Sequence, residues 1–523
     1  MIRARDLGIE IRPDAGRVVA KLFLPGESTP GSVSRTERVL KRVEGLPENV
    51  VASEVAALRP HFADRHDEWE AMMREHAATV RAPGAPPLDP DRELLVGAAF
   101  TSEYAVEGAA LCNPSAVPHP NQSGLQEGQM RVLLTLRGIG ESHLSSMEFV
   151  EAIVGPGEQW HFQPREAPLR VPEIEDREWD KLHFIRSVER RGGLDELGRA
   201  IAQMLPDRFT AAEVAEATHN VRTLQQHQID ARDQLAWFRT VAQSSYRATF
   251  PEDTTLSQRV LMPTAEEERL GIEDVRMILC DDGVYRGTYT AYDGLHIASR
   301  LVTTADFRCF EIERLTGPPA RTKGMAIFGR AINGAYLALT RGDGESMSLS
   351  RSYDGLEWGE EEPLYVPDDG WEVVQSGNCG PPIETEYGWI ALTHGVGPMR
   401  VYSIGAILLD REDPSRVIGV FPGPLIRPDA ADGHGYVPNV VYSCGGLLHD
   451  ERIWIPFGVG DQRVRVAVIG VRELVEAMQP PTRSAAEAVA ALREATRIPT
   501  ATGPTHWAVP ATTEIPIVAQ AGS

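Results

Sequence analysis

Three charged residues, Glu273, Asp274 and Arg276, stand together in the stretch "ERLGIEDVRMILCDDGVYRGTYTAYDG". Apolar residues and a turn flank them, so they need either a water-facing surface or a site. A buried carboxyl beside a second carboxyl can keep its proton near neutral pH and act as a general acid. We therefore expect Asp274 to donate a proton if burial and the charge of Glu273 keep it protonated. The alternative is a structural ion pair with Arg276.

Four basic residues are candidates for an anion site. If the strands that carry them converge, Arg137, Lys323, Arg341 and His394 bring three permanent positive charges and an imidazole together in an otherwise acidic chain. Such a cluster suits a dianion, because Arg offers a planar fork to phosphate or carboxylate oxygens and Lys acts as a point charge. Taken singly, each of these residues is compatible with a surface or structural role.

Asp461 ends an apolar run in "FGVGDQ", where its carboxylate could bind a sugar hydroxyl or cap a turn. Several aromatic residues also stand near the ends of apolar runs. They could form sugar-stacking walls, although such residues more often belong to a hydrophobic core. They are Tyr289, Tyr292, Trp371, Trp389, Tyr402 and Tyr436.

The composition excludes several classes of function. With 52 Lys+Arg against 75 Asp+Glu, the formal net charge of -23 disfavours nucleic acid and anionic membranes as partners. The five cysteines form no CxxC pair, which favours a reducing compartment and gives no metal signature. The sequence begins without a signal-type apolar segment and contains no run of eighteen apolar residues. We expect a cytoplasmic protein without a cofactor or metal.

Other catalytic motifs are weak. The glycine-containing stretches "GNCGPP" and "GPGEQW" lack the strand-to-helix context of a nucleotide-binding loop. GxSxG and HExxH do not occur, and His394 in "THGVG" has no second histidine at metal-ligand spacing. The carboxylates and the basic cluster therefore remain the best candidates for chemistry.

These residues must be positioned by a repeated β unit. Five segments share one plan, an apolar strand with a polar end, a loop and a second strand, and their markers are Arg137, Tyr292, Arg341, His394 and Asp461. The last four markers are about 50 to 70 residues apart, close to a four-stranded propeller blade with its loops. The longer gap after Arg137 is explained by a helical insertion. This pattern predicts a mainly β protein with a five-bladed β-propeller, and the alternative is a β-sandwich of hairpins.

The remaining segments are additions to this repeat. Residues 1–92 predict an N-terminal α/β segment that begins with a hairpin in "IEIRPDAGRVVAKLFLPG". Residues 93–478 predict the catalytic propeller, interrupted by helices at about 190–250, where Thr210 and Glu213 are spaced like a capping box. Residues 479–523 predict a C-terminal helix and tail. The helical additions suggest contacts in a homo-oligomer.

The ordered motifs "CNPSA", "GIEDVRM", "TKGMAIF", "SRSYDGLEWG", "SGNCGPPIETEYGWIALTHGV", "LLDREDPSRVIG" and "GYVPNVVYSCG" before "FGVGD" resemble glycoside hydrolase family 130, the β-mannoside phosphorylases. The resemblance covers about residues 94–479 apart from the helical insertion. It implies a five-bladed propeller that cleaves β-mannosides with inorganic phosphate as co-substrate and inverts them to α-mannose 1-phosphate. The ending "GYVPNVVYSCG", the helical additions and the chain length are most similar to the branch acting on β-1,2-linked manno-oligosaccharides.

The resemblance also assigns residues. It implies Asp274 as the general acid, acting through a mannose hydroxyl, and the basic cluster with nearby Tyr402 as the phosphate site. Substrate binding falls to the remaining matched positions. These are Asn113, Arg276 and Asp461, and we add Glu273, beside the acid, and the aromatic Tyr292 as further substrate-binding candidates.

Three positions depart from the usual family pattern, namely Val275, Gly324 and Thr340, and they affect the glycan subsite and the phosphate geometry. Glu384 stands where a basic residue is often found, which leaves open a hydrolase with a carboxylate base. A glycan-binding propeller without catalysis is a further alternative, in which Asp274 only pairs with Arg276.

Overall fold

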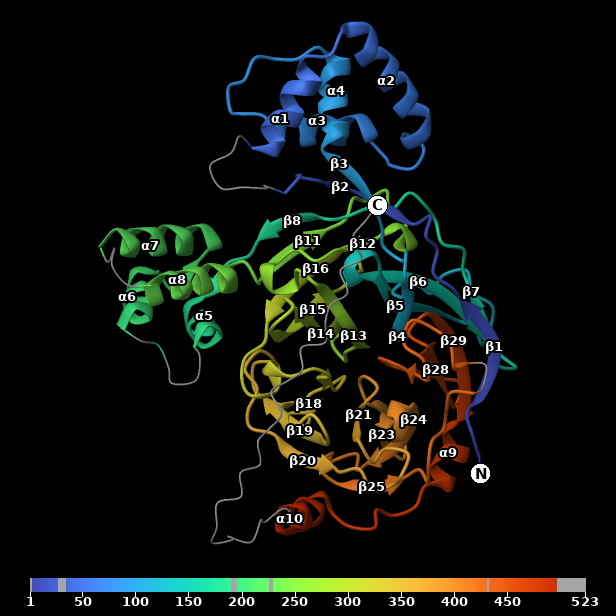
Figure 1. Ribbon diagram of the computed structural model, residues 1–523. Helices are drawn as coiled ribbons and strands as arrows, with labels where there is room; N and C mark the ends of the chain where they lie inside the picture. The colour runs from blue at the N-terminus through green and yellow to red at the C-terminus, as the bar shows by residue number, and fades with distance from the viewer. Residues whose placement is uncertain are drawn as a thin grey trace, which may run out of the picture.

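The structure is a computed structural model that describes residues 2–26, 34–189, 194, 196–224, 229–429 and 432–495. Most of its regular structure is antiparallel β-strand, and the strand groups are arranged around a common centre (Figure 1). The prediction of a mainly β protein is confirmed.

The first two strand groups in chain order, β4 to β7 and β13 to β16, form one sheet. Their strands are β4 (Ala110–Pro118), β5 (Met130–Ile139), β6 (Ser145–Gly155), β7 (Gln159–Phe162), β13 (Gly271–Leu279), β14 (Tyr285–Tyr292), β15 (Ile297–Thr304) and β16 (Cys309–Arg314). A single pair, Gly271 with Ser145, joins β13 to β6. Three short strands extend the sheet, and they are β8 (Glu173–Asp176), β11 (Tyr246–Thr249) and β12 (Val260–Leu261).

The other strand groups follow in chain order. The first contains β17 (Ala326–Ile327), β18 (Tyr336–Thr340), β19 (Met347–Ser352) and β20 (Glu362–Tyr365). The next contains β21 (Gln375–Asn378), β22 (Ile383–Thr385), β23 (Gly388–Val396), β24 (Tyr402–Leu409) and β25 (Val417–Val420). The last contains β26 (Val441–Tyr442), β27 (Leu447–His449), β28 (Arg452–Val459), β29 (Arg463–Gly470) and β1 (Arg5–Ile11).

The N-terminal strands pair with distant partners. β1 runs antiparallel to β29, so the start of the chain completes the sheet of its C-terminal strands. β2 (Val18–Leu22) pairs with β3 (Thr101–Ala105). The predicted hairpin between the first two strands is therefore wrong. Alternating apolar residues indicate a strand but do not select its partner, which is chosen here by long-range packing.

Helices form two separate groups outside the sheets (Figure 1). The chain between β2 and β3 forms α1 (Arg35–Glu44), α2 (Glu48–Phe62), α3 (Trp69–Val80) and α4 (Pro90–Ala99), which share one apolar core. The second group contains α5 (Lys181–Val188), α6 (Glu196–Met204), α7 (Ala211–Leu224) and α8 (Ile229–Ala242), with β9 (Trp179–Asp180) and β10 (Arg208–Phe209). Before α7, the Thr210 amide donates to Glu213 Oε2 at 2.8 Å, one half of the expected capping box.

Two further helices, α9 (Val471–Ala477) and α10 (Ala485–Ala495), follow the last strand. Within the described ranges, no helix is both long enough and apolar enough to cross a membrane. The domain boundaries drawn from the sequence stay predictions.

The hydrophobic core lies between neighbouring strand groups. Trp160 of β7 and Trp454 of β28 pack with ring centroids 6.0 Å apart, which joins the first group to the last. Phe328 and Trp389 pack edge to face at 5.0 Å between two later groups. Such packing holds the sheets face to face and fixes the strand ends that carry the site.

Candidate active site

Asp274 stands at an irregular position of β13. The register between β13 and β14 shifts between Glu273 and Arg276, and Asp274 has a φ of 57°. Asn113 repeats this geometry in β4, where the register shifts between Cys112 and Ser115 and Asn113 has a φ of 51°. Left-handed backbone at a β-bulge is costly for a non-glycine residue and often re-aims a functional side chain.

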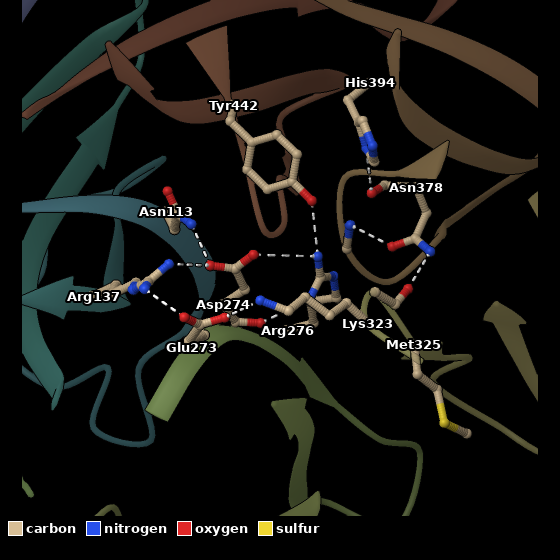
Figure 2. Close-up of polar contacts among 12 residues, drawn as sticks. Asn113, Arg137, Glu273, Asp274, Arg276, Lys323, Met325, Asn378, His394 and Tyr442 are labelled. Carbon is tan, nitrogen blue, oxygen red and sulfur yellow. Dashed lines mark hydrogen bonds and ion pairs between the residues drawn. The ribbon is translucent and has the colours of Figure 1, made fainter. Parts of the chain in front are cut away.

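The two bulges bring the side chains of Asn113 and Asp274 together (Figure 2). Asn113 Nδ2 donates to Asp274 Oδ1, which also lies 3.3 Å from Arg137 Nη1. Arg276 Nη2 lies 3.9 Å from Asp274 Oδ2. Burial alone raises the pKa of Asp274, but the charges of Arg137 and Arg276 and the Asn113 hydrogen bond outweigh it. The pKa is therefore lowered.

Glu273 does not keep Asp274 protonated in this structure, contrary to the condition stated from the sequence. Its carboxylate lies 2.7 Å from Arg137 Nη2 and 2.6 Å from Lys323 Nζ, so its charge is compensated. Lys323 Nζ also lies 5.3 Å from the centroid of the Tyr292 ring. Glu273 thus acts as the counter-ion that places Arg137 and Lys323 beside Asp274.

Arg276 is buried and links two parts of the site. Its Nη1 donates to the Asp274 backbone oxygen at 2.8 Å, and its Nη2 donates to the Tyr442 hydroxyl at 2.8 Å. The Tyr442 ring contacts the His394 ring at a centroid distance of 4.9 Å. Sequence reasoning did not single out Tyr442, and its only signal was its place within "GYVPNVVYSCG".

His394 orients Arg341. Its Nδ1 lies 3.0 Å from the Asn378 backbone oxygen, which can only accept, so Nδ1 carries the proton. The unprotonated Nε2 then accepts from Arg341 Nη1 at 3.1 Å. Burial and the Arg341 charge lower the pKa of His394 to about 3. The imidazole is therefore neutral at physiological pH and contributes orientation, not charge, to the basic cluster.

Tyr402 and Gly377 complete the surroundings of His394. The Tyr402 ring stacks on the imidazole with centroids 6.3 Å apart and an interplanar angle of 15°. Gly377 lies on the strand paired with His394, where an added Cβ would stand 2.6 Å from His394 Cε1 and 3.2 Å from Arg341 Cδ. The glycine thus leaves the room that both side chains need.

Asn378 is a second residue that sequence reasoning missed. Its Nδ2 donates to the Gly324 backbone oxygen at 2.6 Å, next to Lys323, and its Oδ1 accepts from the Gly380 amide at 3.1 Å. Asn378 therefore connects the loop that carries Lys323 to β23, which carries His394 (Figure 2). It belongs to "GNCGPP", which lacks the context of a nucleotide loop and lies within the family motif "SGNCGPPIETEYGWIALTHGV".

Asp461 follows β28 with a φ of 46°. Burial and the charge of Asp274 raise its pKa to about 6, while Arg137 opposes the shift. The two carboxyls thus have opposite pKa shifts, because Asp274 takes the hydrogen bond and the nearest cations.

We expect Asp461→Asn to stabilise the protein at neutral pH. The pKa rises from 3.8 to about 6 on folding, so the folded state loses stability as pH rises through this window and regains it at lower pH. Asn removes the charge and tolerates positive φ. The gain should be ~1–3 kcal/mol above pH 7. Thermal unfolding midpoints at pH 7.5 and about pH 4 would measure it, and an equal gain at both values would contradict the electrostatic explanation.

Two of the six aromatic residues of the predicted wall belong to the core. Tyr289 and Trp389 are buried, with Tyr289 bonded to Glu268 and Trp389 donating to the Arg411 backbone oxygen at 3.1 Å. Trp371 covers the backbone at Gly395 and Gly405. Tyr289 and Trp389 therefore pack in the core, and Trp371 is a half-buried residue that packs beside His394 at Gly395. Tyr292 and Tyr402 contact groups of the site, and Tyr436 lies at its margin.

Glu384 lies apart from the basic cluster. Its carboxylate is 2.8 Å from Arg330 Nη2 and 3.3 Å from Arg411 Nε, and its backbone pairs opposite Trp389 of β23. Hydrogen bonding to Arg330 lowers the pKa of Glu384. The Glu384 carboxylate is thus paired with two arginines. Its strand partner Trp389 stands five residues before His394 in β23.

A family model and two sequence relatives identify the family of this chain. Residues 242–480 match the model of glycoside hydrolase family 130, described as beta-1,4-mannooligosaccharide phosphorylase. A 1,2-beta-oligomannan phosphorylase of Thermoanaerobacter sp. is 32% identical over 226 residues, which cover 42% of this chain and 75% of the relative. A beta-1,2-mannobiose phosphorylase of the same organism is 32% identical over 214 residues, covering 40% and 70%.

Among solved structures, a beta-1,2-mannobiose phosphorylase from Listeria innocua aligns over 72% of this chain and 93% of its own, with 21% identity and a TM-score of 0.42. The family assignment rests on the sequence relatives, because each is at least 30% identical to this chain and most of its length is matched. On this evidence the chain belongs to glycoside hydrolase family 130.

Proposed function

We propose that this protein cleaves β-1,2-linked manno-oligosaccharides with inorganic phosphate and releases α-mannose 1-phosphate. The observation that carries the proposal is the state of Arg341. Its Nε is buried without a hydrogen-bond partner, and among the described residues no carboxylate forms an ion pair with the Arg341 guanidinium. Its Nη1 donates to the neutral His394 Nε2, so within the described residues the guanidinium charge is not balanced by a carboxylate and suits an anionic ligand. Relatives named for phosphorolysis of β-1,2-mannosides support phosphate as that anion.

The mechanism follows from the two sides of the site. Phosphate held by Arg341 and Lys323 attacks the anomeric carbon from the face opposite the leaving group, so no carboxylate is needed to activate water. One displacement inverts the anomeric carbon through an oxocarbenium-like state. Asp274 supplies the proton to the leaving group, in this family through a mannosyl hydroxyl, while Asn113, Arg276 and Asp461 bind the mannosyl unit.

The proposal includes a five-bladed propeller. Five antiparallel strand groups support it, if the single Gly271–Ser145 pair is treated as a contact between two blades. The pairing of β1 with β29 would close the ring between the two ends of the chain. The homo-oligomer and the cytoplasmic location stay predictions from the sequence.

A hydrolase on the same fold is less consistent with the geometry. It needs a carboxylate base on the side of the basic cluster, and Glu384 was the candidate from the sequence. The ion pairs with Arg330 and Arg411 hold that carboxylate elsewhere.

The decisive experiment compares β-1,2-mannobiose and other mannobioses with and without phosphate. We expect mannose 1-phosphate only when phosphate is present, with β-1,2-mannobiose used best. Free mannose in amounts that do not depend on phosphate would identify a hydrolase, and binding without any product would identify a glycan-binding protein.

A further inference from the structure

His143 and Tyr436 form a contact that the mechanism does not use. His143 lies at the tip of the hairpin between β5 and β6, and Tyr436 lies in the loop before β26. The His143 Nδ1 and the Tyr436 hydroxyl are hydrogen-bonded, and the ring centroids lie 5.7 Å apart. The contact therefore bridges the loops next to two site residues, Arg137 at the end of β5 and Asp461 after β28.

Tyr436 lies near the residues proposed to bind the mannosyl unit. Its side chain packs against a small apolar cluster that contains Cys112, the neighbour of Asn113. Its loop is bonded to the residue before Asp461, because the Val437 amide donates to the Gly460 oxygen at 2.9 Å. The charges of Arg137 and Asp461 also act on the Tyr436 hydroxyl. Tyr436 thus forms a wall on the Asn113 and Asp461 side of the site.

The N-terminal addition holds the hairpin that carries His143. Tyr104 of β3 donates its hydroxyl to the Leu144 backbone oxygen at 2.7 Å. Leu144 also packs in an apolar cluster with Val19 of β2 and Tyr104. An added Cβ at Gly140 would overlap the Ala105 backbone oxygen and the Tyr104 hydroxyl. The hairpin base is therefore fitted closely to the β2–β3 stalk, from which α1 to α4 extend (Figure 1).

We propose that His143 and Tyr436 close the mannosyl end of the site and that the β2–β3 stalk keeps this closure in place. The inference rests on the proposed function. A wall at this point accepts a terminal mannosyl unit and rejects one that carries a further substituent on the side facing Asp461. The two polar groups can also bond to hydroxyls of that unit, because a phenol hydroxyl and an imidazole can each donate and accept. His143 and Tyr436 are thereby specificity-determining residues, and Tyr104 is a positioning residue.

The test measures three variants of the full chain. We expect His143→Ala and Tyr436→Ala to raise the KM for β-1,2-mannobiose by about tenfold, with the KM for phosphate unchanged. Both should also gain activity on a mannobiose whose terminal mannose carries a methyl ether, which the wild type rejects. Tyr104→Phe removes only the hydroxyl bonded to Leu144, and it should raise the mannobiose KM in the same direction by about threefold.

Matched controls are His161→Ala, on the outer strand β7, and Tyr353→Ala, whose side chain is 83% exposed between β19 and β20. Neither should change either KM. If the wild type is active but the His143 and Tyr436 variants keep its KM for mannobiose, this inference is overturned and the proposed function is not affected. If Tyr104→Phe lowers the unfolding midpoint without changing the mannobiose KM, the stalk has no positioning role. A wild type that makes no mannose 1-phosphate would instead contradict the proposed function.

Discussion

Asp274→Asn should lose most activity on natural mannosides, by on the order of a hundredfold to ten-thousandfold, the range for a positioned general acid. The substitution keeps the size of the side chain, and Asn also tolerates the left-handed backbone of this bulge. An aryl or fluoride mannoside whose leaving group needs no proton should recover part of the rate. Initial rates on β-1,2-mannobiose and on the activated substrate measure the two effects.

The same variant separates catalysis from structure. Asp274 accepts from Asn113 and faces Arg137, so a purely structural aspartate would also be sensitive to substitution. Equal losses on natural and activated substrates, or an unfolded variant, would support that structural role and make Asp461 the next candidate acid. Unchanged mannobiose binding with lost turnover would exclude a protein that only binds glycans.

Because the pKa of Asp274 is lowered in the structure without substrates, we expect Asp274 to become a proton donor only after the substrates bind. Arg137, Arg276 and Lys323 stabilise the ionised form in the structure. A phosphate dianion beside Lys323 compensates part of this positive charge, and bound sugar excludes water from the carboxyl. Both changes raise the pKa, so we expect the acidic form of Asp274 to become accessible only when phosphate and mannoside are bound.

The sequence predicted which charged residues lie together better than it predicted their protonation states. Charged residues at the ends of apolar runs are visible in the sequence, and the structure brings Arg137, Glu273, Asp274, Arg276 and Lys323 into one network. The pKa directions depend on which partner each carboxylate obtains. The bulges at Asn113 and Asp274 decide this, and a β-bulge leaves no clear mark in a strand pattern.

The residues that were missed act through backbone or ring contacts. Asn378 presents a carbonyl oxygen to His394 and its side chain to Gly324, and Tyr442 accepts from Arg276. Such contacts join strand groups far apart in the sequence, so spacing does not reveal them. The pairing of β1 with β29 was missed for the same reason, since the partner strands lie at opposite ends of the chain.

Arg341→Ala should raise the KM for phosphate by about a hundredfold, which corresponds to ~3 kcal/mol for the loss of a charge-assisted contact to a buried anion. The KM for mannobiose should change far less, because we propose the mannosyl contacts at Asn113, Arg276 and Asp461. Lys323→Ala should act in the same direction with a smaller effect, since Lys323 is already paired with Glu273 and its side chain is 40% exposed. Steady-state kinetics with each substrate varied in turn measures both constants.

Gly377→Ala tests the same site without removing a charge. Its Cβ would press on His394 Cε1 and Arg341 Cδ, at 2.6 and 3.2 Å, and would displace the guanidinium from its acceptor. The phosphate KM should therefore rise in this variant as well. Arg330→Ala is the matched control, because Arg330 is a partly exposed arginine paired with Glu384 outside the basic cluster. If Arg341→Ala raised both substrate KM values equally, Arg341 would be a general structural residue, and the phosphate site would have to be sought around Arg137 and Lys323.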